Sequence, residues 1–304
     1  MSEASDGSSC EVSVVLPLFN EAEHLTEELS RIREAMDASS YSYEIIVVDD
    51  ASTDGSRDLL LGLDYIRLVS FSKNRGSGSA RKAGTKMARG DVVVWSDVDM
   101  TYPNDEIPLL VKELEGHDQV VGARRTEEGS AKVFRVPAKW LIRKLASYLA
   151  ETNIPDLNSG FRAFRRSVIG QFLHMLPPGF SCVTTMTMAF LANGYSVKYV
   201  PIDYAARSGR SKFHWRKDTQ RYLLQVIRLI MSYDPLRVFV PVGLALTALA
   251  LGKLTFDFAT EPFRVAINTL ILFFTGMQAF AIGFIADLIV RSNKLTDEVP
   301  PAQR

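Results

Sequence analysis

Short apolar runs alternate with amphipathic stretches along the first two thirds of the chain. Runs such as residues 12–16 and 92–95 are rich in valine and are bounded by polar or turn-forming residues, which is typical of strands buried in a sheet. Between such runs the apolar residues recur at helical spacing, and Leu25, Leu29, Ile32 and Met36 are one example. Strands are expected at residues 12–16, 43–48, 66–71, 92–95, 119–121 and 197–200.

Helices are expected between these strands, at residues 25–36, 56–63, 76–88, 105–115 and 183–193. Strands that alternate with helices through short connections predict an α/β domain, in which helices cover both faces of a mostly parallel sheet. The segment at residues 156–162 has the composition of a polar turn.

Two apolar segments close the chain, at residues 238–252 and 267–286. The second has about the twenty residues that a membrane-spanning helix needs. The first is short for a full span, so Arg237 and Lys253 at its ends would have to extend toward the lipid headgroups. A short loop that contains Asp257 would connect the two. Basic residues precede the first segment and follow the second, so the positive-inside rule predicts a hairpin with both ends in the cytoplasm. A buried core helix is the alternative for the second segment, but its length and polarity favour lipid.

Composition narrows the function classes. The 35 basic and 35 acidic residues balance, which argues against a general binder of nucleic acid. Only Cys10 and Cys182 are available as thiols, so no disulfide framework or zinc site is expected. The polar residues 1–11 indicate a disordered tail without a secretory signal. The expected organisation is therefore that tail, a cytoplasmic domain at 12–235, the two membrane helices within 236–290, and a cytoplasmic tail at 291–304.

Basic residues concentrate in three stretches in spite of the neutral total. Residues 132–150 and 214–233 combine lysine and arginine with an apolar face, which suits helices that lie at an anionic membrane surface. Ordinary packing on the sheet is the alternative for the first of them. Residues 207–217 are the most basic stretch, and either a solvated or membrane-facing surface or a lid that clamps a pyrophosphate would account for them.

Acidic pairs follow two of the expected strands, Asp49 with Asp50 and Asp97 with Asp99. Ligands of open α/β sheets bind at the carboxyl ends of the strands, which is where both pairs are expected. Asp97 and Asp99, two residues apart on an extended segment, share one face, so both can approach one cation of the Mg²⁺ or Mn²⁺ type. The alternative is a solvent-facing strand end with two solvated aspartates.

Glycines at 76 and 78 open the basic helix at 76–88. A dinucleotide-binding fingerprint would require a third glycine at position 81, which is Arg81, so a nicotinamide site is not expected. A phosphate at this helix N-terminus and a tight turn eased by glycine both remain open.

Three motifs in order, PLFNE at 17–21, VVDDASTDG at 47–55 and DVDM at 97–100, resemble the family-2 glycosyltransferases of the GT-A fold. DLNSGFRAF at 156–164 and RSGRSKF at 207–213, followed by two membrane segments, are similar to the dolichyl-phosphate mannose synthases and equally to the bacterial polyprenyl-phosphate glucosyltransferases. The resemblance covers residues 11–235.

The resemblance implies an inverting transfer of one hexose from a nucleotide-sugar, of the GDP-mannose or UDP-glucose type, to polyprenyl or dolichyl phosphate at the cytoplasmic membrane face. It also implies Mg²⁺ or Mn²⁺ as cofactor, with Asp99 as the main ligand and Asp97 beside it. Asp97, Asp99 and Arg124 would be the catalytic residues. The donor would be bound by Pro17, Asn20, Glu21, Asp49, Asp50, Asp97, Arg207, Ser211 and Lys212, and the acceptor by Arg124, Arg135 and Ser159. Thr101 stands where the mannose synthases usually have glutamine.

The sequence lacks a carboxylate where many sugar transferases have their catalytic base, and this favours a phosphate as the nucleophile. Many sugar transferases place a catalytic carboxylate at the start of the helix that caps the site, but residues 179–193 contain no Asp or Glu. A phosphate monoester, whose second pKa is about 6, is already a nucleophile at neutral pH and needs no such base. A processive polysaccharide synthase is the first alternative, and the lack of a Gln-x-x-Arg-Trp motif weighs against it. A non-catalytic membrane-docking scaffold is the second. The expected partners are the donor, the lipid phosphate and the membrane, and the oligomeric state, including a homo-oligomer, is open.

Overall fold

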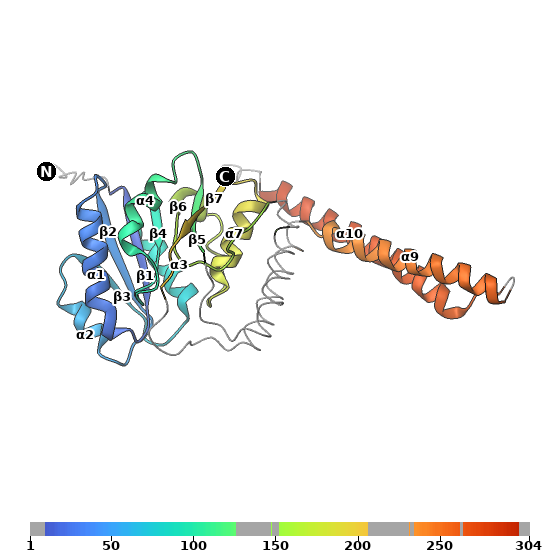
Figure 1. Ribbon diagram of the computed structural model, residues 1–304, viewed down its shortest axis with the longest axis horizontal. Coiled ribbons are helices and arrows are strands. Elements are labelled where there is room, and N and C mark those ends of the chain that lie inside the picture. The colour runs from blue at the N-terminus through green and yellow to red at the C-terminus, as the bar shows by residue number, and fades with distance from the viewer. Residues whose placement is uncertain are drawn as a thin grey trace, which may run out of the picture. The chain divides into compact units, whose positions relative to one another are not determined.

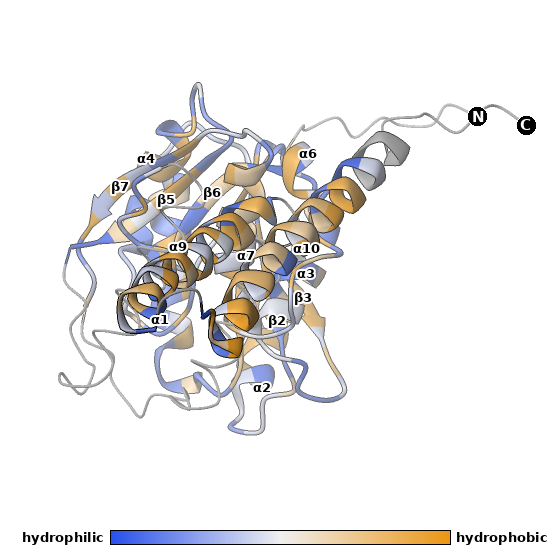
Figure 2. Ribbon diagram, turned by 90° about the vertical axis from the view of Figure 1, so that its right-hand side faces the viewer, coloured by the Kyte–Doolittle hydropathy of each residue, from blue (hydrophilic) through white to orange (hydrophobic). Residues whose placement is uncertain are grey.

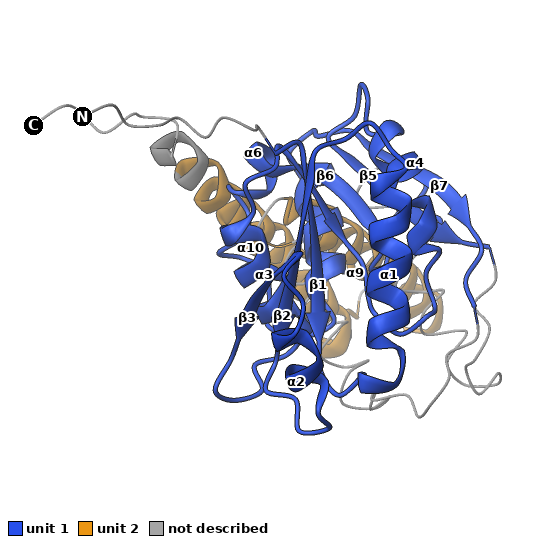
Figure 3. Ribbon diagram, turned by 90° about the vertical axis from the view of Figure 1, so that its left-hand side faces the viewer, with its two compact units in different colours: residues 1–225 blue, residues 226–304 orange. Residues whose placement is uncertain are grey.

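The computed structural model describes residues 10–125, 152–205, 234–261 and 264–297, together with Ser147 and Met231. The chain divides into two units, residues 1–225 and residues 226–304 (Figure 3). The predicted surface helices at 132–150 and 214–233 lie outside the described residues, apart from Ser147 and Met231. Arg135, Arg207, Ser211 and Lys212 also lie outside them.

The first unit is built on one seven-stranded sheet with the order β3-β2-β1-β4-β6-β5-β7 (Figure 1). The strands are β1 (Val12–Leu18), β2 (Tyr43–Asp49), β3 (Ile66–Ser70), β4 (Val92–Trp95), β5 (Gln119–Arg124), β6 (Arg162–Arg165) and β7 (Val197–Ile202). β6 runs antiparallel to β4 and β5, and the other neighbours pair in parallel. The α/β prediction with a mostly parallel sheet is therefore confirmed.

β6 is the strand that the sequence did not predict. It has four residues, Arg-Ala-Phe-Arg, and begins at the last residue of the segment expected to be a polar turn. Its register places Arg162 opposite Trp95, the last residue of β4. The segment that leads into β6 therefore arrives at the carboxyl ends of the parallel strands.

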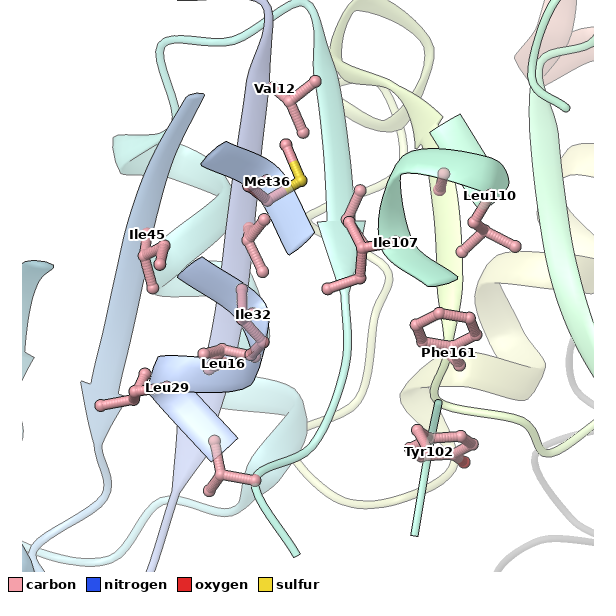
Figure 4. Packing of buried hydrophobic residues seen from close by; sticks show 14 of the residues in the cluster. Val12, Leu16, Leu29, Ile32, Met36, Ile45, Tyr102, Ile107, Leu110 and Phe161 are labelled. Carbon is pink, nitrogen blue, oxygen red and sulfur yellow. The ribbon is translucent and has the colours of Figure 1, made fainter. Parts of the chain in front are cut away.

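Helices cover both faces of the sheet, as expected. On one face lie α1 (Ala22–Asp37), α2 (Ser56–Leu61), the 3₁₀ turn η1 (Asn104–Glu106) and α4 (Ile107–Lys112). On the other lie α3 (Ser77–Met87), α6 (Arg166–Ile169) and α7 (Cys182–Ala192). The predicted stripe of α1 is buried in the first core, where Leu29, Ile32 and Met36 pack against the sheet (Figure 4). Burial of such side chains stabilises the fold by about 1.5–3 kcal/mol each.

The glycines before α3 allow another backbone segment to approach closely. A Cβ on Gly78 would lie 2.3 Å from the carbonyl oxygen of Pro177, and one on Gly76 would lie 2.5 Å from that of Pro178. Gly76 also has a φ of +90°, which suits glycine. The Ser79 amide donates to the Pro178 carbonyl at 3.1 Å, so an amide that could hold a phosphate is already engaged. The structure thus accounts for the two glycines by a close backbone approach, and a phosphate at this helix N-terminus stays a prediction.

The second unit is a pair of long apolar helices, α9 (Leu236–Thr260) and α10 (Ile267–Asp297) (Figure 2). Both are long and apolar enough to cross a membrane. The expectation that the first segment is short was wrong. Its 25 residues span about 37 Å at 1.5 Å per residue, which exceeds the roughly 30 Å hydrocarbon core.

Asp257 explains why the first helix was underestimated. It lies inside α9 rather than in a connecting loop, and Lys253 donates to its carboxylate at 2.7 Å. The other carboxylate oxygen of Asp257 accepts from the hydroxyl of Thr269 at 2.5 Å and from the amide of Ala266 at 3.2 Å. Lys253 and Asp257 thus neutralise each other inside α9. Asp257 also connects α9 to the start of α10 through its hydrogen bonds.

The boundaries of both expected tails differ between the structure and the sequence prediction. Residues 1–9 lie outside the described part of the chain, but the Glu11 amide donates to the Ser42 carbonyl at 2.9 Å. The ordered domain therefore begins before residue 12. At the other end, α10 continues to Asp297, so the expected tail starts within a helix.

Candidate active site

Several chain segments meet at one edge of the sheet, where the parallel strands end and β6 begins. Three of them carry a strained residue. Asn20 follows β1 with a φ of 53°, Ala51 follows β2 with a φ of 63°, and Met100 follows β4 with a φ of 60°. These are the positive-φ residues other than glycine in the described part of the chain. Strained backbone conformations cluster at functional sites. They cost free energy, so they persist only where the surrounding structure imposes them.

Asp97 is paired with a buried arginine. Nη2 of Arg81, in α3, donates to Oδ1 of Asp97 at 2.6 Å, and only 3% of the Arg81 side chain is exposed. Burial by itself would lower the pKa of Arg81, but the charge of Asp97, together with smaller contributions from Cys182 and Tyr102, raises the pKa above its ordinary value. Gly160 leaves room for the pair, since a Cβ there would lie 2.9 Å from Arg81 Nη2 and 3.0 Å from Asp97 Oδ2. This close approach explains the glycine of the DLNSGFRAF motif.

Arg81 is not among the site residues predicted from the sequence. The available signal was its place in α3, beside Ala80 on the face that packs on the sheet and one turn before Thr85. A charged residue at a buried helical position needs a partner, and here the partner is Asp97.

Asp99 is buried rather than solvent-facing, with 8% of its surface exposed. Its Oδ1 accepts from the Thr101 hydroxyl at 2.5 Å and from the Thr101 amide at 3.4 Å. The alternative of a solvent-facing strand end with a solvated aspartate is therefore wrong for this residue, which lies beside the turn at Met100. Thr101, the departure from the mannose-synthase pattern, holds the carboxylate of Asp99.

Arg124, which was expected at the acceptor phosphate, forms a bidentate salt bridge with Asp156. Nε and Nη2 of Arg124 donate to the carboxylate at 2.6 and 2.9 Å, and the guanidinium lies over the ring of Tyr204, 5.2 Å from its centre. Burial alone would raise the pKa of Asp156, but the hydrogen bonds from Arg124 lower it below its ordinary value. The same pairing raises the pKa of Arg124 against its own burial. The cation is thus partly neutralised before any acceptor binds.

Ser159 is fully buried. Its hydroxyl accepts from the Phe161 amide at 3.3 Å, and its carbonyl accepts from Nε of Arg162 at 3.1 Å. Arg162 is itself fully buried, which lowers its pKa to about 10. The role of Ser159 in acceptor binding therefore stays a prediction, beside a structural role that the contacts do show.

The residues expected at the nucleoside lie together at the ends of β1 and β2. Oδ1 of Asn20 accepts from the Thr53 amide at 2.7 Å, and the Glu21 amide donates to the Ser56 hydroxyl at 3.3 Å. Asp50 accepts from the Arg75 and Gly76 amides at 2.6 and 2.8 Å, and burial raises its pKa.

Asp49 completes this group. Its Oδ1 accepts from the Ser52 amide at 3.0 Å, and Pro17 lies in β1 opposite Val48, the residue before Asp49. These contacts shape the loops of the site, and the donor-binding roles of all five residues stay predictions.

The described residues hold no group of three or more His, Cys, Asp or Glu side chains that could bind a metal alone. A cation at this edge would therefore rely on Asp97, Asp99 and oxygens of a ligand. That donor set of two carboxylates with substrate phosphates is the one that Mg²⁺ commonly uses.

Comparison with known proteins identifies the family. Residues 13–173 match the model described as Glycosyl transferase family 2, and residues 234–292 match the one described as the GtrB C-terminal hairpin. The chain belongs to glycosyl transferase family 2. The family that the sequence motifs indicated is confirmed, and this family 2 glycosyltransferase carries the hairpin that its C-terminal hydropathy predicted.

Curated relatives match almost the whole glycosyltransferase. The undecaprenyl-phosphate 4-deoxy-4-formamido-L-arabinose transferase of Pseudomonas fluorescens (strain SBW25) is 31% identical over 92% of this chain and 84% of its own. The protein of the same name from Aeromonas hydrophila is 30% identical over 92% and 88%. That from Shewanella sediminis is 33% identical over 76% and 70%.

Solved structures confirm the GT-A fold of the glycosyltransferase. Glucosyl-3-phosphoglycerate synthase from Mycobacterium tuberculosis, in complex with Mn²⁺, uridine diphosphate and phosphoglyceric acid, superimposes with a TM-score of 0.60. The sequence identity is 22%, over 72% of this chain and 78% of that chain. The same synthase in complex with uridine diphosphate gives a TM-score of 0.59.

Proposed function

We propose that this family 2 glycosyltransferase moves one sugar from a nucleotide-sugar to polyprenyl phosphate at a membrane. The observation that carries the proposal is the match to relatives named for undecaprenyl phosphate, which extends over 92% of the chain. A relative that shares only the catalytic fold would say little about the acceptor. These relatives share the catalytic domain and the chain beyond it.

Asp97 and Asp99 would hold a divalent cation, Mg²⁺ or Mn²⁺, against the donor pyrophosphate. The Mn²⁺ and uridine diphosphate bound by the synthase of the same fold support this type of site. When bound, the cation would offset the charge that develops on the leaving nucleoside diphosphate.

The basic stretch at 207–217 would supply the remaining positive charge. The Ala205 amide donates to the Thr101 carbonyl at 3.0 Å, so the described chain before this stretch ends beside the aspartate motif. Arg207 follows two residues later, and Ser211 and Lys212 come after it. These three residues would close over the donor phosphates.

The first turn of α7 adjoins the site without offering a base. The Val183 carbonyl accepts from Nη1 of Arg162 at 2.9 Å, and the Thr184 hydroxyl donates to Oδ1 of Asn158 at 3.1 Å. Residues 179–193 contain no Asp or Glu. A phosphate oxygen of the lipid would attack the anomeric carbon directly while the bond to the nucleoside diphosphate breaks. No proton has to be removed from that nucleophile, and a single displacement inverts the anomeric configuration.

The hairpin would hold the enzyme at the cytoplasmic face. Arg237 at the start of α9 and Arg291 near the end of α10 are basic residues on the same side of the two spans. The positive-inside rule then places both ends, and the catalytic unit that precedes them, in the cytoplasm.

A donor screen tests this function. Full-length protein in detergent is incubated with undecaprenyl phosphate and with labelled UDP-glucose, GDP-mannose or UDP-4-deoxy-4-formamido-L-arabinose, in Mn²⁺, in Mg²⁺ or in chelator. We expect one donor to give a labelled lipid, with activity lost in chelator and restored by metal. Asp99→Ala should abolish transfer. Full activity in excess chelator would overturn the metal assignment, and labelled polysaccharide in place of a monoglycosylated lipid would favour the processive alternative.

A further inference from the structure

Glu28 in α1 is a carboxylic acid that the catalytic domain buries completely, with 0% of its surface exposed. Leu25, Leu29 and Ile32 surround it on the same buried stripe of the helix. A carboxylate loses hydration when it is buried, and the loss costs free energy unless polar partners compensate. A leucine at this position would pack in the core without the cost of burying a carboxylate. The acid therefore indicates a role besides helix packing.

Asn104 in η1 connects Glu28 to the aspartate motif. Nδ2 of Asn104 donates to Oε1 of Glu28 at 2.7 Å, and the same nitrogen donates to the backbone carbonyl of Asp97 at 3.0 Å. Oδ1 of Asn104 accepts from the Ser96 hydroxyl. Asn104 is fully buried. It is held by Glu28 and in turn bonds the consecutive residues Ser96 and Asp97.

Arg31 strengthens the attachment from the solvent side. Its Nη1 donates to Oε1 of Glu28 and to the backbone carbonyl of Tyr102, each at 3.4 Å, and Nη2 pairs with Asp105. One turn of α1 therefore holds both ends of the chain between Ser96 and Asp105. The contacts from this turn to Tyr102, Asn104 and Asp105 join residues 71, 76 and 74 positions apart.

The segment between Ser96 and Asp105 also has contacts outside α1, since Asp97 pairs with Arg81 and the Thr101 carbonyl accepts from the Ala205 amide. Residues 96–103 form neither helix nor strand, and Met100 within them has a φ of 60°. An L-residue seldom adopts this conformation unless its surroundings impose it. The directions of the Asp97 and Asp99 carboxylates therefore depend on the side chains that hold this segment.

We propose that Glu28 is a positioning residue for the cation and donor site, acting through Asn104 on the backbone of Ser96 and Asp97. The identity of the ligand rests on the proposed function, whereas the hydrogen-bonded support does not. Loss of a comparable outer partner typically weakens metal binding by about 10- to 100-fold. An effect of that size is expected here.

The test compares variants that keep or remove Oε1. Within the described residues Oε2 of Glu28 has no hydrogen-bond partner, so the acid acts through Oε1, which glutamine also has. Glu28→Gln should keep the wild-type Mn²⁺ affinity and the wild-type hydrogen exchange of residues 96–103. Glu28→Leu, apolar and of similar size, should weaken Mn²⁺ binding by about 10- to 100-fold and speed hydrogen exchange in residues 96–103. Affinity is measured by calorimetry on the full-length protein in detergent, with Mn²⁺ in the presence of UDP and, in parallel, GDP.

A double-variant cycle separates positioning from general destabilisation. If Glu28 acts through Asn104, then Asn104→Leu should reproduce the loss, and Glu28→Leu should add nothing to it. Leu29→Ala, at the next buried position of α1, should lower the melting temperature without changing the Mn²⁺ affinity. Glu27→Leu removes an exposed carboxylate from the same turn and should change neither.

Unchanged Mn²⁺ affinity and exchange in Glu28→Leu would overturn the proposal, and so would additive losses in the double variant. A wild type that binds no Mn²⁺ with either nucleotide would count against the proposed function instead. In that case faster exchange of residues 96–103 in Glu28→Leu would still establish the positioning role, and unchanged exchange would refute it.

Discussion

Asp97 and Asp99 differ in the partners that hold them. Asp97 shares its charge with the Arg81 guanidinium, whereas Asp99 accepts a hydrogen bond from the neutral hydroxyl of Thr101. A carboxylate already paired with a cation attracts a metal less strongly. We therefore expect the pairing with Arg81 to weaken the attraction of Asp97 for a metal.

Thr101→Val tests the part played by the hydroxyl at this position. Valine keeps the shape of threonine but cannot donate to Asp99, so the carboxylate loses the contact that orients it. Calorimetry should show Mn²⁺ affinity about tenfold weaker in the presence of UDP, and Thr101→Ser should retain the wild-type value. Equal affinities for the valine and serine variants would show that the hydroxyl does not orient the metal ligand.

Glu28 predicts a pH dependence of stability with a definite sign. Burial raises its native pKa, so the folded protein binds this proton more tightly than the unfolded chain does. The contribution to the free energy of unfolding is then greatest at low pH. It falls as the pH rises from the ordinary glutamate pKa of about 4.3 through the native value.

Glu28→Gln removes that titration while keeping Oε1. Its melting temperature should therefore exceed that of the wild type at pH 8, and the difference should shrink toward pH 4. Thermal melts across this range measure it, with Glu27→Gln as the exposed control. A difference that grows toward low pH would contradict the assigned direction.

Elements with their own apolar pattern could be predicted from the sequence, whereas residue pairs that join different elements could not. The parallel strands and α1 were predictable because each has its own apolar pattern, and the acidic pairs were predictable because strand ends carry the ligands of such sheets. β6 was not, since four residues with arginine at both ends have no readable alternation. The pairs Arg81–Asp97 and Glu28–Asn104 join different elements, and no single segment contains the information that brings them together.

The Arg124–Asp156 pair joins β5 to the segment before β6, and it complicates any test of Arg124 as an acceptor ligand. Because both side chains are largely buried, removing one leaves the other charge unpaired. Arg124→Leu alone should lower the free energy of unfolding by about 3–5 kcal/mol. Arg124→Leu combined with Asp156→Leu should recover most of the loss, as chemical denaturation would show.

The double variant then gives a clean measurement of acceptor binding. If Arg124 binds the lipid phosphate, the folded double variant should have a raised KM for undecaprenyl phosphate and an unchanged affinity for UDP. An unchanged acceptor KM would assign Arg124 to the fold alone. Failure of the double variant to recover stability would mean that the pair contributes more than charge compensation.

At the scale of the whole molecule, the hairpin and the basic stretches predict two modes of membrane attachment. Full-length protein should resist extraction by alkaline carbonate, because α9 and α10 each exceed the hydrocarbon thickness. A chain that ends at residue 233 should instead sediment with anionic vesicles at low salt and be released at high salt, since only surface charge would hold it. A truncated chain that fails to bind anionic vesicles at low salt would show that residues 132–150 and 214–233 do not act at the membrane surface.

The central claim is that the nucleophile is a lipid phosphate, which attacks without a protein base. The most direct measurement supplies undecaprenyl phosphate and undecaprenol separately to the full-length enzyme, with the donor found in the screen, and analyses the lipid product by mass spectrometry and ³¹P NMR. We expect a glycosyl phosphodiester of inverted anomeric configuration from the phosphate and no product from the alcohol. Efficient transfer to free undecaprenol would contradict it, because an alcohol acceptor requires the general base that residues 179–193 lack.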